Sequence, residues 1–119
     1  AVEARGDRRF VRVKVPKGKG TLHAAAGSST VTGDILDISE AGMACLLKTD
    51  FGPGTVLPDI QLRLWGGILS VGGTIRGTRS SPEGTVSVIM FDPIEDSRVR
   101  SKLYTFLRRV MQYEVDNLL

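Results

Sequence analysis

Arginine side chains are concentrated near the start of the chain, where Arg8, Arg9 and Arg12 lie within five residues. A guanidinium group is planar, permanently charged and forked, so it can clamp a phosphate, or O6 and N7 of guanine, through two hydrogen bonds. In an extended segment Arg8 and Arg12 would point to the same side, about 13 Å apart, a span that suits a dinucleotide better than one phosphate. A basic surface strand without a specific ligand would have the same composition.

A second polar motif, Asp37-x-Ser39-x-x-Gly42, follows about 25 residues after Arg12. The Asp37 carboxylate can accept hydrogen bonds from the N1–H and N2–H₂ donors of guanine, and the Ser39 hydroxyl can donate or accept beside it. Gly42 allows a positive φ angle or a close approach of the backbone to a ligand. The same three residue types also occur in an ordinary Asx turn.

The positive charge of the chain lies mainly at one end. Residues 1–20 contain seven Lys or Arg and two acids, whereas the remaining residues contain nine bases and eleven acids. This asymmetry indicates an anionic partner, although a basic tail can also be merely solvated.

Length and composition predict one folded domain in a reducing compartment. A chain of 119 residues with 41% hydrophobic and 24% charged residues is typical of a single soluble globular domain. One cysteine, Cys45, cannot form an internal disulfide, and its apolar neighbours predict a buried thiol. The sequence has no long apolar run and no signal-peptide pattern, so we expect a cytoplasmic protein without membrane insertion. Because the first residue is alanine, the chain could be a module of a longer protein.

Alternating apolar residues predict a series of short strands that carry these motifs. Asp37 to Gly42 is expected to form the turn between two of the strands, and Gly72–Gly73 a bulge or a corner. Short strands at a spacing of roughly ten residues are typical of an antiparallel barrel or sandwich. In the strand after this turn, Met43, Cys45 and Leu47 are expected on one face, and Val86, Val88 and Met90 alternate along the last strand. The expected strands are residues 10–15, 21–26, 30–36, 43–48, 60–65, 68–76 and 86–91.

After residue 92 the hydrophobic period changes from that of a strand to that of a helix. Asp96 or Ser97 is a candidate N-cap, and one helix is expected over residues 97–117. Its apolar stripe should face the barrel or a partner protein. The stripe consists of Val99, Leu103, Phe106, Val110 and Tyr113.

The order of the two motifs, on short strands followed by a terminal helix, resembles the PilZ domain family. Arg8 and Arg12 match the fixed positions of its arginine motif, and Asp37, Ser39 and Gly42 match its second motif. The resemblance implies an all-β dominated fold, a six-stranded antiparallel β-barrel with a C-terminal α-helix, that binds the bacterial second messenger cyclic di-GMP. It implies ligand contacts from Arg8, Arg9, Arg12, Asp37, Ser39 and Gly42, with Arg5, Arg76 and Arg79 as further candidates.

The resemblance also divides the chain into a flexible basic arm (1–9), a barrel (10–92) and a helix (97–117). The leading hypothesis is a non-catalytic sensor in which cyclic di-GMP orders the arm and thereby signals to an attached effector domain or a downstream protein. An alternative keeps the fold as a protein-interaction module that does not bind cyclic di-GMP. A third hypothesis, binding of single-stranded nucleic acid, is disfavoured because aromatic residues make up only 6% of the sequence.

Other kinds of site have weaker support in the sequence. His23 is the only histidine and has no cysteine or carboxylate at metal spacing, so we expect no metal site. Lys17 to Thr21 lacks the spacing of a phosphate-binding loop. Because no nucleophile has a paired base in the sequence pattern, we expect neither catalytic residues nor a cofactor.

Overall fold

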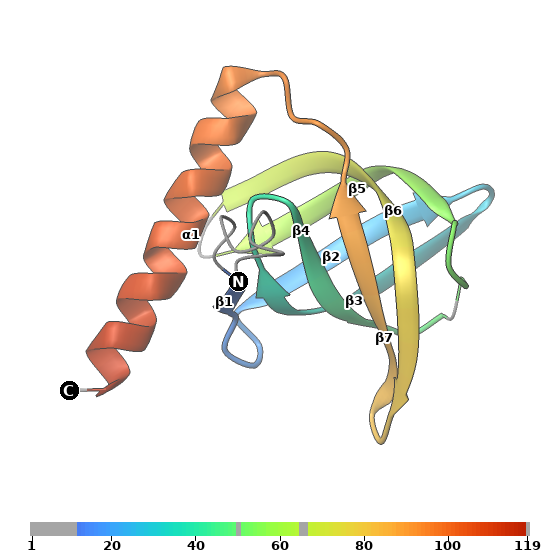
Figure 1. Cartoon of the computed structure of the whole chain (residues 1–119), viewed down its shortest axis with the longest axis horizontal. Coiled ribbons are helices and arrows are strands. Elements are labelled where there is room, and N and C mark those ends of the chain that lie inside the picture. Colours follow the sequence, from blue (N-terminus) through green and yellow to red (C-terminus); the bar gives the residue numbers. More distant parts are fainter. Residues whose placement is uncertain (1–11, 50, 65–66, 119) are drawn as a thin grey trace, which may run out of the picture.

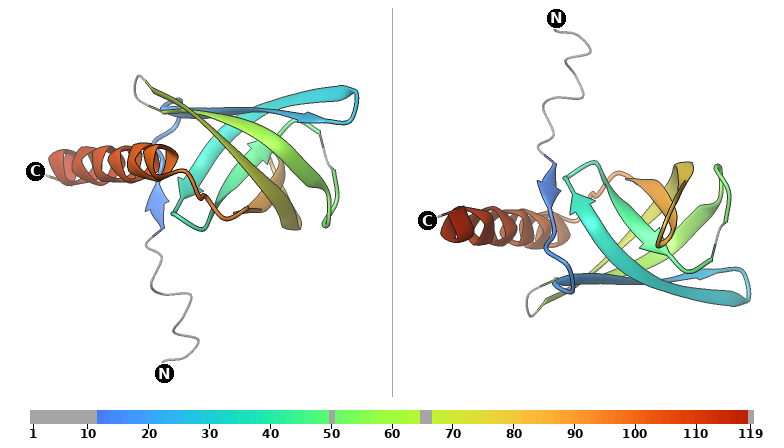
Figure 2. Two further views of the ribbon diagram at one scale, coloured as in Figure 1. Left: turned by 90° about the horizontal axis from the view of Figure 1, so that it is seen from above. Right: turned by 90° about the horizontal axis from the view of Figure 1, so that it is seen from below.

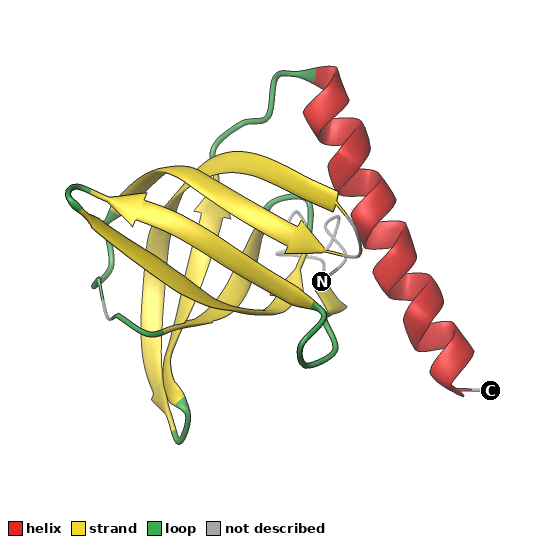
Figure 3. Ribbon diagram, turned by 180° about the vertical axis from the view of Figure 1, so that it is seen from behind, coloured by secondary structure: helices red, strands yellow, loops and turns green. Residues whose placement is uncertain are grey.

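Six antiparallel strands close into a barrel, and a C-terminal helix lies beside it (Figures 1 and 3). This computed structural model describes residues 12–49, 51–64 and 67–118. The sheet order is β1-β3-β2-β5-β6-β7-β4, and pairing of β3 with β4 closes strands β2 to β7 into the predicted six-stranded barrel. The elements are β1 Val13–Lys14, β2 Gly20–Ala26, β3 Ser29–Ile38, β4 Gly42–Leu47, β5 Val56–Leu64, β6 Gly67–Ser81, β7 Gly84–Phe91 and α1 Ser97–Leu118.

The barrel interior is filled by alternate residues of these strands. Met43, Cys45 and Leu47 of β4 are all buried, which confirms the face predicted for them. Burial of a large aliphatic side chain such as that of Leu47 stabilises the folded state by about 2 kcal/mol. The largest fully buried strand side chains are Leu22, Ile38, Met43, Leu57, Ile60, Leu62, Leu64, Ile75 and Ile89.

Several strand boundaries differ from the expected ones: β5 begins at Val56 and not at residue 60, and β6 continues to Ser81 and not only to residue 76. In β1 only Val13 and Lys14 are in strand conformation, and residues 10 and 11 of the predicted strand lie outside the described residues. The irregularity expected at Gly72–Gly73 lies between β5 and β6, where the register shifts between Leu57 and Ile60 of β5. The extra residue is therefore in β5, opposite Gly72, because Leu57 pairs with Gly73 and Ile60 pairs with Val71.

Helix α1 lies across one end of the barrel, next to β1 (Figure 2). The Asp96 carboxylate accepts a hydrogen bond from the Arg98 backbone N–H at 2.8 Å, which confirms Asp96 as the N-cap. Of the predicted stripe, Leu103, Phe106 and Val110 are buried, and Leu103 and Phe106 belong to the same hydrophobic core as the barrel interior. No helix in the described part of the chain combines the length and the apolar character that a membrane span needs.

Cys45 provides a pH-dependent probe of this core. Burial, with a smaller contribution from the negative charge of Asp37, raises the pKa of its thiol from 9.0 to about 12. Between these values the unfolded thiol loses its proton while the folded thiol keeps it, so the free energy of unfolding falls as the pH rises. From pH 8 to 10.5 we expect urea titrations to show a decrease about 2 kcal/mol larger for the native chain than for Cys45→Ala. Equal decreases in both proteins would contradict this prediction.

Candidate ligand-binding site

An ion pair joins the two motifs found in the sequence. The Arg12 guanidinium donates to Asp37 Oδ1 through Nη2 at 2.8 Å and through Nε at 3.3 Å, across a sequence separation of 25 residues. Strand pairing brings the two residues together, because Lys14 of β1 lies opposite Asp37 of β3. The Arg12 and Asp37 side chains are 57% and 27% exposed, so both remain accessible to a ligand.

Asp37 lies within strand β3, and the prediction that it belongs to the turn is wrong. Its backbone pairs with β1 on one side and with β4 on the other, where the register shifts between Ile35 and Asp37. The two ladders on either side extend the strand to Ile38, past the turn boundary that local sequence suggested. Asp37 Oδ1 also accepts a hydrogen bond from the Ala44 backbone N–H at 3.3 Å, which orients the carboxylate.

Ser39 builds the tight turn between β3 and β4. Its hydroxyl accepts hydrogen bonds from the backbone N–H groups of Ala41 at 3.1 Å and Gly42 at 3.3 Å, and its own N–H donates to the Gly42 carbonyl at 2.8 Å. The side chain is buried. Ser39 therefore shapes the turn, and its direct contact with a ligand stays a prediction.

Gly42 is required by the close approach of β7. A Cβ atom at this position would collide with the Ile89 carbonyl oxygen. Gly42 is not among the described glycines with positive φ, so the positive φ considered from the sequence is not the reason for this glycine. The Phe91 N–H donates to the Ala41 carbonyl at 2.8 Å and fixes the turn on β7.

A hollow of about 370 Å³ lies on the outer surface beside this turn. Arg76 of β6 lines it, and the Arg76 guanidinium contacts the Met90 sulfur at 3.2 Å. Arg79, the other late arginine considered from the sequence, does not line the hollow. The lining residues are Arg12, Ser39, Ala41, Gly42, Met43, Arg76, Val88, Ile89 and Met90.

Sequence reasoning missed Val88 and Met90 as site residues. They are 37% and 46% exposed on the outer face of β7, whereas Ile89 and Phe91 between and after them are buried. The four consecutive residues from Val88 to Phe91 are all apolar, so both faces of this strand carry apolar side chains. This run in the sequence could have indicated an apolar surface on the outside of the barrel as well as inside it. The remaining predicted arginines, Arg5, Arg8 and Arg9, lie outside the described residues.

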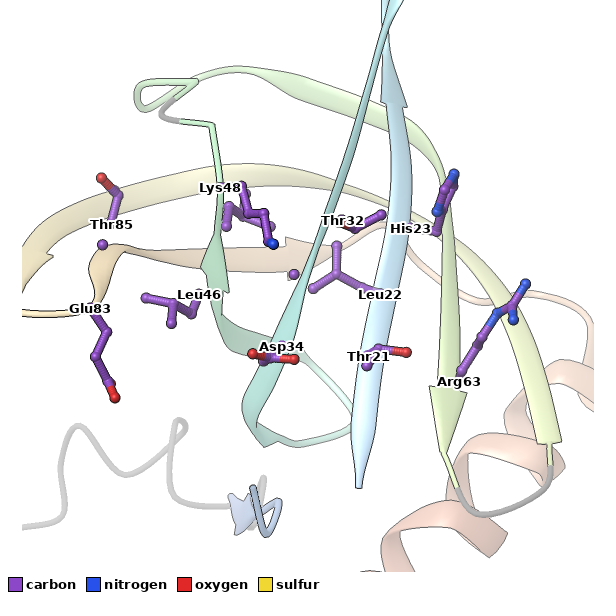
Figure 4. Close-up of a pocket in the computed structure, with 13 residues that line it drawn as sticks. Thr21, Leu22, His23, Thr32, Asp34, Leu46, Lys48, Arg63, Glu83 and Thr85 are labelled. Carbon is purple, nitrogen blue, oxygen red and sulfur yellow. The ribbon is translucent and has the colours of Figure 1, made fainter. Parts of the chain in front are cut away.

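A larger hollow of about 880 Å³ lies elsewhere on the barrel exterior (Figure 4). Its charged side chains have both signs: Asp34 of β3 and Arg63 of β5, with Lys48 just after β4 and Glu83 in the turn between β6 and β7. Of the motif residues that the structure describes, Arg12, Asp37, Ser39 and Gly42, none lines it. His23 is also there, and among the described residues no three potential metal ligands of the His, Cys, Asp or Glu types are grouped. We therefore place the candidate site at the smaller hollow.

The sequence matches the family model described as "PilZ domain" over residues 6–109, which agrees with the resemblance seen in the motifs. The structure is similar to the PilZ domain with c-di-GMP of YcgR from Escherichia coli, with 18% identity, coverage of 92% of this chain and 97% of that chain, and a TM-score of 0.74. No curated protein matches the sequence.

Two longer proteins have the same fold over part of their length. The inhibitor of motility MotI/DgrA of Bacillus subtilis is 16% identical, with 88% of this chain and 51% of that chain covered and a TM-score of 0.68. The MrkH–c-di-GMP complex of K. pneumonia is 16% identical, with 89% and 55% covered and a TM-score of 0.65. The chain thus spans about half the length of both, and identities this low show a common fold alone.

Proposed function

Because this chain belongs to the PilZ domain family, we propose that it is a non-catalytic receptor for cyclic di-GMP. The observation that carries the proposal is the contact between Arg12 and Asp37 beside the Ser39 turn. It joins Arg12, a forked cation that lines the hollow, to Asp37, a carboxylate from a motif 25 residues away that can accept hydrogen bonds from guanine. The structures of the YcgR domain and of MrkH, both described with c-di-GMP, support the same ligand class.

Ligand binding would replace the ion pair. In this structure Arg12 and Asp37 neutralise each other. We expect Arg12 to turn to a phosphate or to the O6 and N7 edge of guanine, and Asp37 to accept hydrogen bonds from guanine N1–H and N2–H₂. Each partner exchanges one charge-assisted interaction for another, so breaking the pair is offset by the new contacts.

The outer face of β7 would hold the guanine ring. Val88 and Met90 present exposed apolar surface to the hollow, and the Arg76 guanidinium lies against the Met90 sulfur. A guanine between this apolar surface and the Arg76 guanidinium plane would stack on the arginine. The edge of the same guanine would donate hydrogen bonds to Asp37.

The proposal includes a signalling step at the start of the chain. Arg8 and Arg9, with Arg5 as a further candidate, would bind the second phosphate and guanine, so that residues 1–9 close over the ligand as an ordered arm. The new surface would be recognised by an attached effector domain or a downstream protein. A ligand shifts such an equilibrium only through its different affinities for the two states.

Isothermal titration calorimetry with cyclic di-GMP tests the proposal, with GTP and cyclic GMP as controls. We expect saturable binding of cyclic di-GMP at tens of micromolar protein, and much weaker binding of both controls because neither has two guanines joined by two phosphates. Arg8→Ala and Asp37→Ala should each weaken binding. Absence of binding by the native chain, or full affinity in both variants, would leave the protein-interaction alternative in place of the receptor.

A further inference from the structure

Helix α1 is joined to the turn between β3 and β4 by a side-chain hydrogen bond. The Tyr104 hydroxyl donates to Glu40 Oε2 at 2.5 Å, across a sequence separation of 64 residues. Glu40 lies in this turn between Ser39 and Ala41, and both neighbours line the hollow of the candidate site, whereas Glu40 does not. The helix therefore holds a carboxylate next to the candidate site but outside it.

Glu40 lines a second hollow, of about 390 Å³, between the turn and α1. Tyr104 and Arg100 line this second hollow from the helix side. Ala41 and Met90 line both hollows, so the two hollows adjoin at the turn. Glu40 thus belongs to the hollow beside α1, and the hydrogen bond from Tyr104 keeps its carboxylate there.

The ionisation of Tyr104 reports this contact. Its hydrogen bond to Glu40, and then the negative charge of that carboxylate, raise the pKa of the Tyr104 hydroxyl above its ordinary value of 10.0. The positive charge of Arg100 acts in the opposite direction. Asp92 is the remaining charged residue that lines the second hollow in the described part of the chain. Since Tyr104 is 44% exposed, the contribution of burial is smaller than that of Glu40.

A free carboxylate at position 40 would oppose the proposed ligand. Cyclic di-GMP carries a negative charge on each of its two phosphates. A glutamate side chain rotates about several single bonds, so without a partner it can also turn toward the hollow that Ser39 and Ala41 line. Repulsion between like charges several ångströms apart at a protein surface would weaken binding about fivefold.

From this arrangement we propose that Tyr104 is a positioning residue for cyclic di-GMP. Its hydroxyl holds the Glu40 carboxylate on the α1 side of the turn, away from the ligand phosphates. Tyr104 acts through Glu40, since it does not line the hollow of the candidate site. The inference rests on the proposed receptor function, and it gives α1 a role at the site in addition to its packing against the barrel.

Calorimetric titration of the complete chain with cyclic di-GMP tests the proposal in a double-mutant cycle. Tyr104→Phe keeps the ring and removes the hydroxyl, and we expect it to bind about fivefold more weakly. Glu40→Gln should stay within about twofold of the native affinity, since the native carboxylate is already held away. The double variant should also recover to within about twofold, because no carboxylate remains to be held. If the hydroxyl only braced the turn, the double variant would stay as weak as Tyr104→Phe.

The salt dependence of binding separates the same two roles. The difference between Tyr104→Phe and the native chain should shrink to less than about twofold when salt rises from about 0.1 M to about 1 M, because the screening length falls from about 10 Å to about 3 Å. Loss of a purely structural contact would persist at both concentrations. Tyr113→Phe is the matched control, because it removes the hydroxyl of the other tyrosine of α1, which lines neither hollow, and its affinity should remain native.

Titration of tyrosine absorbance with pH tests the contact without ligand, and circular dichroism shows whether each variant is folded. The difference between the native chain and Tyr104→Phe isolates the ionisation of Tyr104, which should occur at lower pH in the Glu40→Gln background. Unchanged ionisation, native affinity of Tyr104→Phe, or no recovery in the double variant would overturn this inference and leave the receptor function in place. No binding of cyclic di-GMP by the native chain would overturn both.

Discussion

Arg12→Ala is expected to weaken cyclic di-GMP binding by about a hundredfold. Arg12 supplies two charge-assisted donors at the edge of the hollow, where they now bind Asp37 at 2.8 and 3.3 Å. Each hydrogen bond to a charged group contributes about 1.5 to 3 kcal/mol, and part of this is regained because the substitution also removes the ion pair that the ligand must break. A net loss of about 3 kcal/mol corresponds to the hundredfold change, measured by calorimetric titration.

Arg79→Ala is the matched control for this substitution. It removes an exposed arginine from the same barrel, on β6, but Arg79 does not line the hollow. We expect the Arg79→Ala affinity to stay within about twofold of the native value, since only long-range, salt-screened attraction is lost. Equal affinities of Arg12→Ala and the native chain would refute the assignment of Arg12 to the site. A large loss of affinity in Arg79→Ala would instead indicate that cyclic di-GMP binds elsewhere on β6, near Arg79.

Gly42→Ala is expected to lower the free energy of unfolding by about 3 kcal/mol. The added methyl group would collide with the Ile89 carbonyl oxygen, a backbone atom that cannot rotate away. Strands β4 and β7 would have to separate where Gly42 pairs with Met90, and the hydrogen bond from Phe91 to the Ala41 carbonyl would lengthen. Urea unfolding measures the loss, and cyclic di-GMP binding should weaken as well because the same turn borders the hollow.

Gly77→Ala makes the same chemical change where the structure has room. A Cβ atom at Gly77 would have no neighbour within 4 Å, and the φ angle of Gly77 is not positive. The reduced freedom of the unfolded chain should leave this variant within about 1 kcal/mol of the native stability. If both variants unfolded at the same urea concentration, steric contact with β7 would not explain the requirement for Gly42.

The local patterns of the sequence were sufficient for the order and type of the elements and for the inner faces of β4 and α1. The two-residue period of Met43, Cys45 and Leu47 and the helical spacing of Leu103, Phe106 and Val110 each describe burial on one side of one element, and both predictions are confirmed. Burial of this kind depends on the periodicity of a segment, which can be read without knowing its neighbours. The motif order was likewise enough to predict the family and the closed barrel.

The tertiary structure alone decided which surfaces meet. Asp37 is in a strand because β1 and β4 both pair with it, and Gly42 is needed because β7 passes behind it. The outward direction of Val88 and Met90, and the choice of Arg76 over Arg79 beside them, follow from the register of β7 with its neighbours. Register is set by long-range packing and changes the direction of every side chain when it shifts by one residue, so no local pattern contains it.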